Sequence, residues 1–193
     1  MTTNVAVSEH SRKRQKPEGF TIWMTGLSGS GKSTLAGVLK QRLENQYDRY
    51  VEILDGDEVR KGLSRDLGLS REHREEHARR VSYLAKVLSR NSVISIVALI
   101  SPYKVSRDSA RETIGEDRFV EVYIKASLAA CETRDPKGLY AKARKGEIKN
   151  MTGISDPYEP PENPEITIET ETGTPEESAD LLIEKLRELG FSL

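Results

Sequence analysis

The feature that most constrains this sequence is a glycine-rich segment at residues 26–34, Gly-Leu-Ser-Gly-Ser-Gly-Lys-Ser-Thr, which matches the pattern GxxxxGK[ST]. A β-rich run at residues 20–25 precedes it directly, and apolar residues at helical spacing follow it. Glycines let such a loop turn its backbone N–H groups towards one point, and the N-terminus of the next helix adds positive potential there. The alternative is a tight turn with an incidental lysine. The order of strand, loop and helix favours a phosphate-binding loop.

Two side chains of this loop are expected to act on a nucleoside triphosphate. Lys32 can reach the β- and γ-phosphates, and the Ser33 hydroxyl can ligate Mg²⁺. We therefore predict Lys32 as a catalytic residue and Ser33 as the metal ligand. The other loop residues expected to bind the nucleotide are Gly26, Ser28, Gly29, Ser30, Gly31 and Thr34.

Five β-rich runs alternate with longer helical patterns along the chain, at residues 20–25, 51–54, 93–100, 119–124 and 165–169. Such alternation predicts right-handed crossovers and a five-stranded parallel sheet with helices on both faces, an α/β fold. The run at 93–100 is almost continuously apolar, so we expect it at the centre of the sheet.

Local signals place the main helices and one long connection. Ser70 is the expected N-cap of a helix that begins at Arg71, and Thr174-Pro175-Glu176-Glu177 forms a capping box before a terminal helix that packs on the sheet. Between residues 135 and 164 the chain contains a short helical piece at 138–145 and then a proline-rich stretch. A connection of this length in a compact domain is typical of a lid.

Composition limits the classes of protein to consider. The 193 residues include 30 Lys and Arg against 31 Asp and Glu, which argues against a nucleic-acid binder with a basic face. The single cysteine, Cys131, cannot form an intramolecular disulfide. The longest apolar run is far shorter than the roughly 20 residues of a membrane-spanning helix. We therefore expect a cytoplasmic protein that binds neither nucleic acid nor membrane.

The length suits one folded domain, which we place at residues 18–193. Residues 1–17 are polar and end in a basic run, Ser-Arg-Lys-Arg-Gln-Lys-Pro. Few large apolar residues are present to offset the entropy of ordering, so a disordered basic arm is predicted. A nuclear address or a phosphate-binding patch would have the same composition, but a solvated tail is favoured.

Two acidic residues follow the second β-rich run, in the segment Asp55-Gly56-Asp57. The carboxyl end of a strand next to the phosphate loop borders the crevice where open α/β sheets bind ligands. There a carboxylate can orient an acceptor hydroxyl or hold metal-bound water. For Asp55 we favour this role over a simple turn. For Asp57, N-capping of the next short helix is an equal alternative.

Several arginines follow this acidic segment. On a helix that begins at Arg71, Arg74 and His77 share one face, which can bind a polyanionic second substrate. The other interpretation is ion pairing with neighbouring glutamates on a solvated surface, which we favour for Arg71 and for at least one of Arg79 and Arg80. The arginines of this region are Arg60, Arg65, Arg71, Arg74, Arg79 and Arg80.

Together these motifs resemble the adenylylsulfate kinase family, which uses ATP to phosphorylate the 3′-hydroxyl of adenosine 5′-phosphosulfate. The resemblance extends from about residue 19 to residue 190. Besides the loop, it includes Leu-Asp-Gly-Asp-Glu-Val-Arg-Lys-Gly-Leu at 54–63, Asp-Leu-Gly-Leu-Ser-Arg-Glu-His-Arg at 66–74 and Ile-Ser-Pro-Tyr at 100–103. Two later blocks are more specific to the family, Arg-Asp-Pro-Lys-Gly-Leu-Tyr at 134–140 and Thr-Gly-Ile-Ser-Asp-Pro-Tyr-Glu-Pro-Pro at 152–161.

The resemblance implies a three-layer P-loop kinase fold, a lid at residues 138–160, a homodimer, and ATP and adenosine 5′-phosphosulfate as substrates. Asp55 would face the acceptor hydroxyl as base or orienting group. Arg60 and Arg74 would bind the phosphosulfate or ribose of the acceptor, and Arg134 would lie against the ATP adenine. The other positions expected to contact the acceptor are Asp57, Leu69, His77, Ile100, Ser101, Lys137, Leu139 and Met151.

Three positions depart from the family pattern. Aromatic residues usually occupy the places of Leu69 and Met151, and an Asn is common in the place of His77. Apolar contact here would replace aromatic stacking on the acceptor adenine, which contributes about 1 to 3 kcal/mol per base. Three alternatives to an adenylylsulfate kinase therefore stay open: a kinase of another nucleotide-linked anion such as a cytidine diphosphate derivative, another small-metabolite kinase, or a non-catalytic nucleotide-binding partner of a sulfate-activating enzyme.

Overall fold

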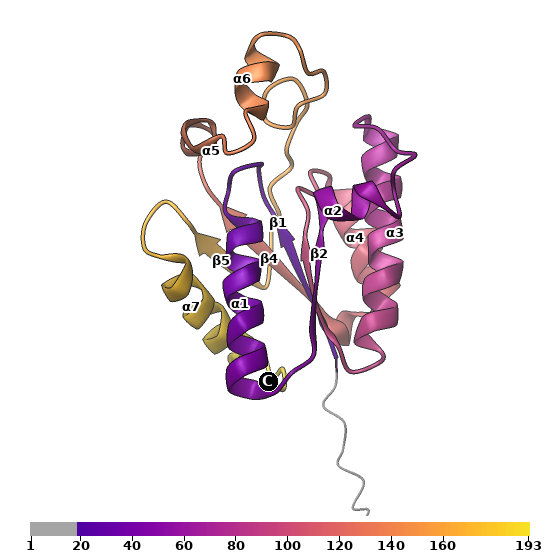
Figure 1. Cartoon of the computed structure of the whole chain (residues 1–193). Coiled ribbons are helices and arrows are strands. Elements are labelled where there is room, and N and C mark those ends of the chain that lie inside the picture. The colour runs from indigo at the N-terminus through magenta and orange to yellow at the C-terminus, as the bar shows by residue number, and fades with distance from the viewer. Residues whose placement is uncertain (1–18) are drawn as a thin grey trace, which may run out of the picture.

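The computed structural model describes residues 19–193, and the predicted N-terminal arm lies outside this range. The five β-rich runs form one sheet in which every pair of neighbours is parallel, in the order β2-β3-β1-β4-β5 (Figure 1). The strands are β1 (Thr21–Thr25), β2 (Val51–Asp55), β3 (Ile94–Ala98), β4 (Phe119–Lys125) and β5 (Ile166–Glu169). The predicted parallel sheet is confirmed. The prediction that residues 93–100 hold its centre is wrong, because β1 occupies that place with β3 beside it.

Helices cover both faces of the sheet and make three layers (Figure 1). The long helices α1 (Lys32–Tyr47) and α7 (Pro175–Glu188) pack on one face, and α3 (Arg71–Ser89) and α4 (Lys104–Ile114) pack on the other. The short helices are α2 (Gly56–Lys61), the 3₁₀ turn η1 (Glu116–Arg118), α5 (Leu128–Arg134) and α6 (Leu139–Arg144). No helix in this part of the chain is long and apolar enough to cross a membrane.

Strand periodicity explains the two cores. Side chains alternate between the faces of a strand, so neighbours along β1 enter different layers. Ile22 and Met24 pack with α1 and α7, whereas the fully buried Trp23 packs with α3 and α4. A third cluster lies beneath the lid and includes Cys131, Tyr140 and Met151. The lid is thus a folded part of the domain with its own apolar contacts.

The structure confirms two of the predicted helix caps. The Ser70 hydroxyl accepts from the His73 N–H at 3.3 Å, and the Thr174 capping box is formed with Glu177. At α2 the cap is Asp55, whose Oδ1 accepts from the Asp57 N–H at 2.9 Å. Asp57 is therefore not the cap, and its carboxylate is directed elsewhere.

Candidate active site

A cavity of about 540 Å³ opens at the carboxyl ends of the strands, between the phosphate loop, α2, α3 and the lid. Most of the residues predicted from sequence line it. They are Ser28, Gly29, Gly31, Lys32, Ser33, Thr34, Asp55, Asp57, Arg60, Leu69, Arg74, His77, Ile100, Ser101, Arg134, Lys137, Leu139 and Met151. Of the predicted set, Gly26 and Ser30 do not line the cavity.

Gly26 and Ser30 instead hold the lysine of the phosphate loop. The Lys32 ammonium donates to the carbonyl oxygens of Gly26 at 2.9 Å and Leu27 at 2.7 Å, and to Ser30 Oγ at 3.3 Å. Burial lowers the pKa of Lys32 to about 8. Because burial disfavours the charged form, an anion placed beside this ammonium would be strongly favoured. The site is therefore suited to a phosphate.

Asp55 joins the phosphate loop to the second strand. Its Oδ2 accepts a hydrogen bond from the Ser33 hydroxyl at 2.6 Å, while its Oδ1 caps α2. Hydroxyl and carboxylate oxygens are hard ligands of the kind Mg²⁺ prefers, so Ser33 and Asp55 fit that ion. Within residues 19–193 no group of three or more His, Cys, Asp or Glu side chains could hold a metal. Such a pair suits Mg²⁺ that takes its other ligands from phosphates and water.

Arg74 connects α3 to the lid. Its side chain is 8% exposed, and its guanidinium donates to the Leu69 carbonyl at 3.0 Å and to the Asn150 carbonyl at 2.9 Å. Asp156 in the lid lies 4.0 Å from Arg74 Nε and accepts from the Tyr103 hydroxyl at 2.6 Å. The prediction from sequence missed Tyr103 and Asp156 as part of this junction, although both lie in the blocks that resemble the family.

A second contact closes the mouth of the cavity from the other side. The Asp57 carboxylate forms an ion pair with Lys137, which lies between α5 and α6. Arg60 lies beside it and donates to the Gly68 carbonyl at 3.0 Å. Burial and the neighbouring Arg74 lower the pKa of Arg60. Two guanidinium groups thus share one region of the cavity, where they can bind an anion together.

His77 is buried on the same face of α3 as Arg74, 4% exposed, and neither ring nitrogen has a hydrogen-bond partner among the described residues. Burial first, and then Arg60, Arg80 and Arg74, lower its pKa to about 4. The imidazole is therefore neutral at pH 7. It offers one N–H donor and one nitrogen acceptor at the cavity wall.

The outward-facing arginines form surface ion pairs, as predicted. Arg71 pairs with Glu75 at 3.0 Å, and both Arg79 and Arg80 pair with Glu76, at 2.6 and 2.8 Å. These residues do not line the cavity. The arginines therefore divide into a buried group at the cavity and an exposed group at the surface.

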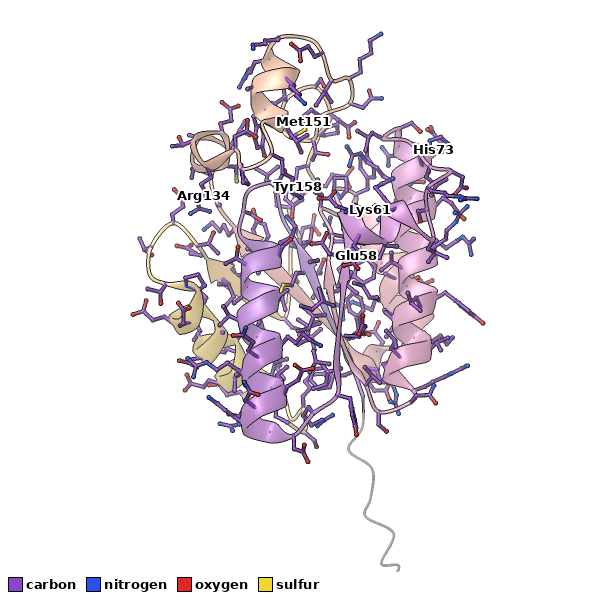
Figure 2. All side chains as sticks on the ribbon, in the orientation of Figure 1. Glu58, Lys61, His73, Arg134, Met151 and Tyr158 are labelled. Atoms are coloured by element: carbon purple, nitrogen blue, oxygen red, sulfur yellow. The ribbon has the colours of Figure 1, made fainter. Side chains whose placement is uncertain are left out.

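The opposite wall is formed by Arg134 and the segment after β5. Arg134 Nη1 donates to the Gly29 carbonyl and to Thr170 Oγ1, both at 3.3 Å, and the Thr170 hydroxyl donates to the Ser30 carbonyl at 2.7 Å. Figure 2 shows Arg134 on the far side of the molecule from His73 of α3. Thr170, Thr172, Gly173, Thr174 and Pro175 also line the cavity, and the prediction from sequence missed them because no motif marks them.

The two aliphatic residues at the expected adenine positions differ in exposure. Leu69 is 42% exposed at the cavity mouth, whereas Met151 is 5% exposed and packs in the cluster beneath the lid. Figure 2 shows Met151 within the lid, above the sheet. Both side chains line the cavity from opposite elements, so they can contact a flat ring between them.

Comparisons with known proteins agree on one family. The family model for adenylylsulphate kinase matches residues 18–169. An adenylyl-sulfate kinase from Halothermothrix orenii is 53% identical over 174 residues, 90% of this chain and 92% of the relative. One from Clostridium acetobutylicum is 50% identical over 194 residues, 97% of this chain and 96% of the relative. The Mycobacterium tuberculosis APS kinase CysC, solved with AMPPNP and APS, superposes with a TM-score of 0.84 at 42% identity, covering 89% of this chain and 99% of that chain.

Asp55→Asn tests the carboxylate at the junction of loop and strand. Asparagine keeps the α2 cap but removes the charge that can accept a proton or orient a hydroxyl. We expect kcat for ADP formation to fall about a hundredfold or more, with little change in thermal stability. Glu58→Gln, which removes an exposed carboxylate on the same helix, is the control and should keep kcat within about twofold. Equal kcat values for the two variants would contradict the role of Asp55.

The lowered pKa of His77 has a consequence for stability. The folded pKa of about 4 lies below the ordinary value of 6.5, so the unfolded chain binds a proton at His77 more readily. Its contribution to stability is present above pH 6.5 and is lost as the pH falls towards 4. Urea unfolding of wild type and His77→Asn at pH 7 and pH 5 measures this, and wild type should lose more stability on acidification. Equal losses would show that His77 is not protected from protonation.

Proposed function

The chain belongs to the adenylylsulfate kinase family, and on this premise we propose that it transfers the γ-phosphoryl group of ATP to the 3′-hydroxyl of adenosine 5′-phosphosulfate. The observation that carries the proposal is the single cavity in which the phosphate loop meets Asp55 and a pair of buried arginines. Phosphoryl transfer needs little covalent chemistry from the protein, so catalysis rests on positioning and charge. The residues of this cavity supply both.

The donor half is the phosphate loop with its flanking wall. Backbone N–H groups of residues 28–34 and the Lys32 ammonium would bind the β- and γ-phosphates, and Arg134 with Thr170 would border the adenine. Mg²⁺, held through Ser33 and the phosphates with Asp55 nearby, would neutralise charge on the phosphates. Lys32 would exchange its loop carbonyl partners for phosphate oxygens, since anions stabilise its charged form.

The acceptor half uses Asp55, Arg60, Arg74 and His77. Asp55 Oδ2 already accepts from one hydroxyl, that of Ser33, so its geometry suits a hydroxyl donor from the cavity side. The acceptor 3′-hydroxyl would donate to it, and the carboxylate would orient the hydroxyl or take its proton. Arg60 and Arg74 would bind the phosphosulfate, and the neutral imidazole of His77 would hydrogen-bond the ribose or base.

The remaining predicted contacts enclose the acceptor. Leu69 and Met151 would hold the adenine by apolar contact, with Leu139 from the lid. Ile100 and Ser101 would form the floor, and the Asp57–Lys137 ion pair would join the lid to α2. A closed lid excludes water, which would otherwise compete for the γ-phosphoryl group.

The quaternary state and location are inferred from the family resemblance. We propose a homodimer in the cytoplasm. The sole thiol, that of Cys131, is buried and unpaired, as suits a reducing compartment. Sedimentation velocity on the full chain would measure the mass of the assembly, and a monomer would exclude the dimer.

One alternative acceptor is supported by an observation. Leu69 and Met151 provide no aromatic stacking, and stacking is what most favours a large purine base. A nucleotide-linked anion with a smaller base, such as a cytidine diphosphate derivative, would lose less from this change. The arginines would bind the phosphates of either ligand.

An acceptor panel tests the proposed function. ADP formation is followed with adenosine 5′-phosphosulfate, a cytidine diphosphate derivative, a nucleoside monophosphate or no acceptor. We expect turnover with adenosine 5′-phosphosulfate to exceed that with each of the others by at least a hundredfold, because charge and ring contacts are both satisfied only there. Preferred turnover of the cytidine derivative would establish the alternative acceptor. Absence of acceptor-dependent turnover would contradict kinase activity.

Leu69→Phe tests the apolar clamp. Leu69 lies exposed at the cavity mouth, so a larger ring can be accommodated there, whereas the buried Met151 has less free space. Partial stacking on the adenine should lower the KM for adenosine 5′-phosphosulfate by about three- to tenfold, with the KM for ATP unchanged. A raised or unchanged KM for the acceptor would argue against adenine binding beside Leu69. Leu63→Phe, at an exposed leucine outside the cavity, is the control.

A further inference from the structure

The segment 100–102, which follows β3 and lines the cavity, has an unusual backbone. Ser101 has φ +43, the left-handed region that non-glycine residues rarely adopt. Its hydroxyl accepts from Trp23 Nε1 at 3.1 Å, and Thr25 Oγ1 donates to the carbonyls of Ile100 at 2.8 Å and Ser101 at 3.3 Å. A strained residue persists only where its surroundings hold it. Something must therefore hold the Ser101 peptide in place.

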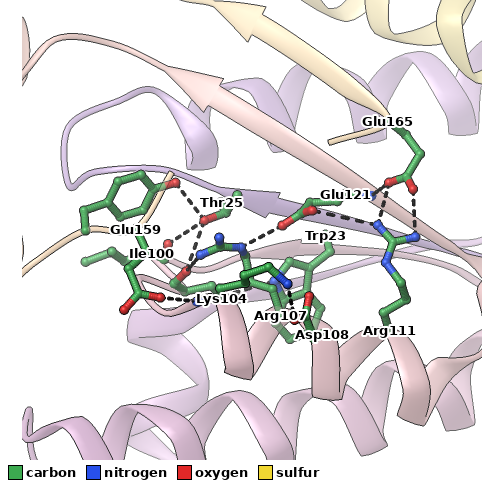
Figure 3. Close-up of polar contacts among 12 residues, drawn as sticks. Trp23, Thr25, Ile100, Lys104, Arg107, Asp108, Arg111, Glu121, Glu159 and Glu165 are labelled. Atoms are coloured by element: carbon green, nitrogen blue, oxygen red, sulfur yellow. Dashed lines mark hydrogen bonds and ion pairs between the residues drawn. The ribbon is translucent and has the colours of Figure 1, made fainter. Parts of the chain in front are cut away.

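The strongest of these restraints is Arg107 of α4. Its side chain is 3% exposed, and its Nη1 donates to the Ser101 carbonyl at 2.8 Å (Figure 3). Its Nε lies 2.7 Å from Oε1 of Glu121, a carboxylate of β4 that is 11% exposed. A buried guanidinium between a carboxylate and a carbonyl has both charge and hydrogen bonds compensated. Arg107 thus transmits the position of β4 and α4 to the loop after β3.

Glu121 is itself held in place. Arg111 Nη2 lies 3.8 Å from Glu121 Oε2, and Arg111 Nη1 forms a 2.7 Å ion pair with Glu165 Oε1 (Figure 3). Glu165 Oε2 accepts from the Glu121 N–H at 2.6 Å. The carboxylate that orients Arg107 is therefore fixed by a second arginine and by the strand backbone.

The same loop is tied to the end of the lid. The Thr25 hydroxyl donates its only proton to Ile100, so Tyr158, 2.9 Å away, donates to Thr25. The Glu159 N–H donates to the Pro102 carbonyl at 2.8 Å, and its carboxylate accepts from the Lys104 N–H at 2.7 Å. Residues 100–102 therefore lie between a buried ion pair on one side and the return of the lid on the other.

Sheet order decides which substrate this loop serves. The loop follows β3, which lies between β1 and β2, so it is next to Asp55 at the end of β2. Thr170, which carries the partner of Arg134, follows β5 at the opposite edge. The loop is therefore on the acceptor side of the cavity, away from the wall assigned to the ATP adenine.

We propose that Arg107, oriented by Glu121, is a positioning residue for acceptor binding, which it acts on by holding the Ser101 peptide in its left-handed conformation. This role rests on the proposed function, because it needs an acceptor that contacts residues 100–102. Arg107 does not line the cavity and touches no substrate. Its effect is confined to the shape of the acceptor wall.

Steady-state kinetics of Arg107→Met, with ATP and adenosine 5′-phosphosulfate varied separately, tests the proposal. We expect the KM for adenosine 5′-phosphosulfate to rise about tenfold, the KM for ATP to stay within about twofold, and kcat to fall less than the acceptor KM rises. Arg107→Lys should recover part of the acceptor KM, because one ammonium can reach the carbonyl or the carboxylate but not both as well as a guanidinium.

Two further variants separate positioning from general stability. Arg107→Met with Glu121→Gln removes the buried charge that the single variant leaves, so it should fold and still show the raised acceptor KM. Arg118→Met removes a guanidinium that donates to the Gly19 and Ser89 carbonyls at 3.0 and 3.1 Å, at the other end of the sheet, and should leave both KM values unchanged.

The outcomes distinguish this inference from the proposed function. If wild type turns over adenosine 5′-phosphosulfate but the folded double variant keeps the wild-type acceptor KM, the positioning role is wrong and the function stands. Equal increases in both KM values would also overturn it, because they indicate general loosening. If wild type shows no turnover with this acceptor, the proposed function has failed, and with it the inference.

Discussion

The Lys32 ammonium lies against carbonyl oxygens of its own loop, and the rest of the site is arranged around this enclosure. The loop can fold so tightly only because Gly26 has no side chain, since a Cβ there would lie 2.5 Å from the Ile124 carbonyl oxygen. That contact presses the loop against β4 at the end of the central strand. The cation is therefore placed where elements from both halves of the sheet can reach it, which is what a reaction between two bound anions requires.

The sheet order separates the two substrates. Elements after β4 and β5, including Arg134 and Thr170, border one side of the phosphate loop, and elements after β2 and β3 border the other. Asp55 lies at the boundary because its strand lies next to β3 and its carboxylate reaches Ser33. Parallel strands bring all these ends to one edge, so side chains far apart in the chain meet without a special connection.

Closure of the cavity uses charges that also serve binding. Arg74 bonds to the backbone of Leu69 and of Asn150, and thus links helix α3 to the lid from a place next to the acceptor. Asp57 and Lys137 form a second link. Since acceptor phosphates would attract the same cations, acceptor binding and lid position are coupled through shared groups. The aliphatic pair Leu69 and Met151 makes this polar closure more important here than stacking.

The sequence by itself determined the parallel α/β fold, the phosphate loop, the roles available to Lys32 and Ser33, and the caps at Ser70 and Thr174, because each depends on residues close together in the chain. Only the tertiary structure decided which strand is central, that Asp55 rather than Asp57 caps α2, and that Arg74 serves the lid. It alone paired Arg107 with Glu121 beneath Ser101 and Arg134 with Thr170. The physical reason is that a long side chain can reach many partners, and which one it meets depends on how strands and helices pack rather than on its neighbours in sequence.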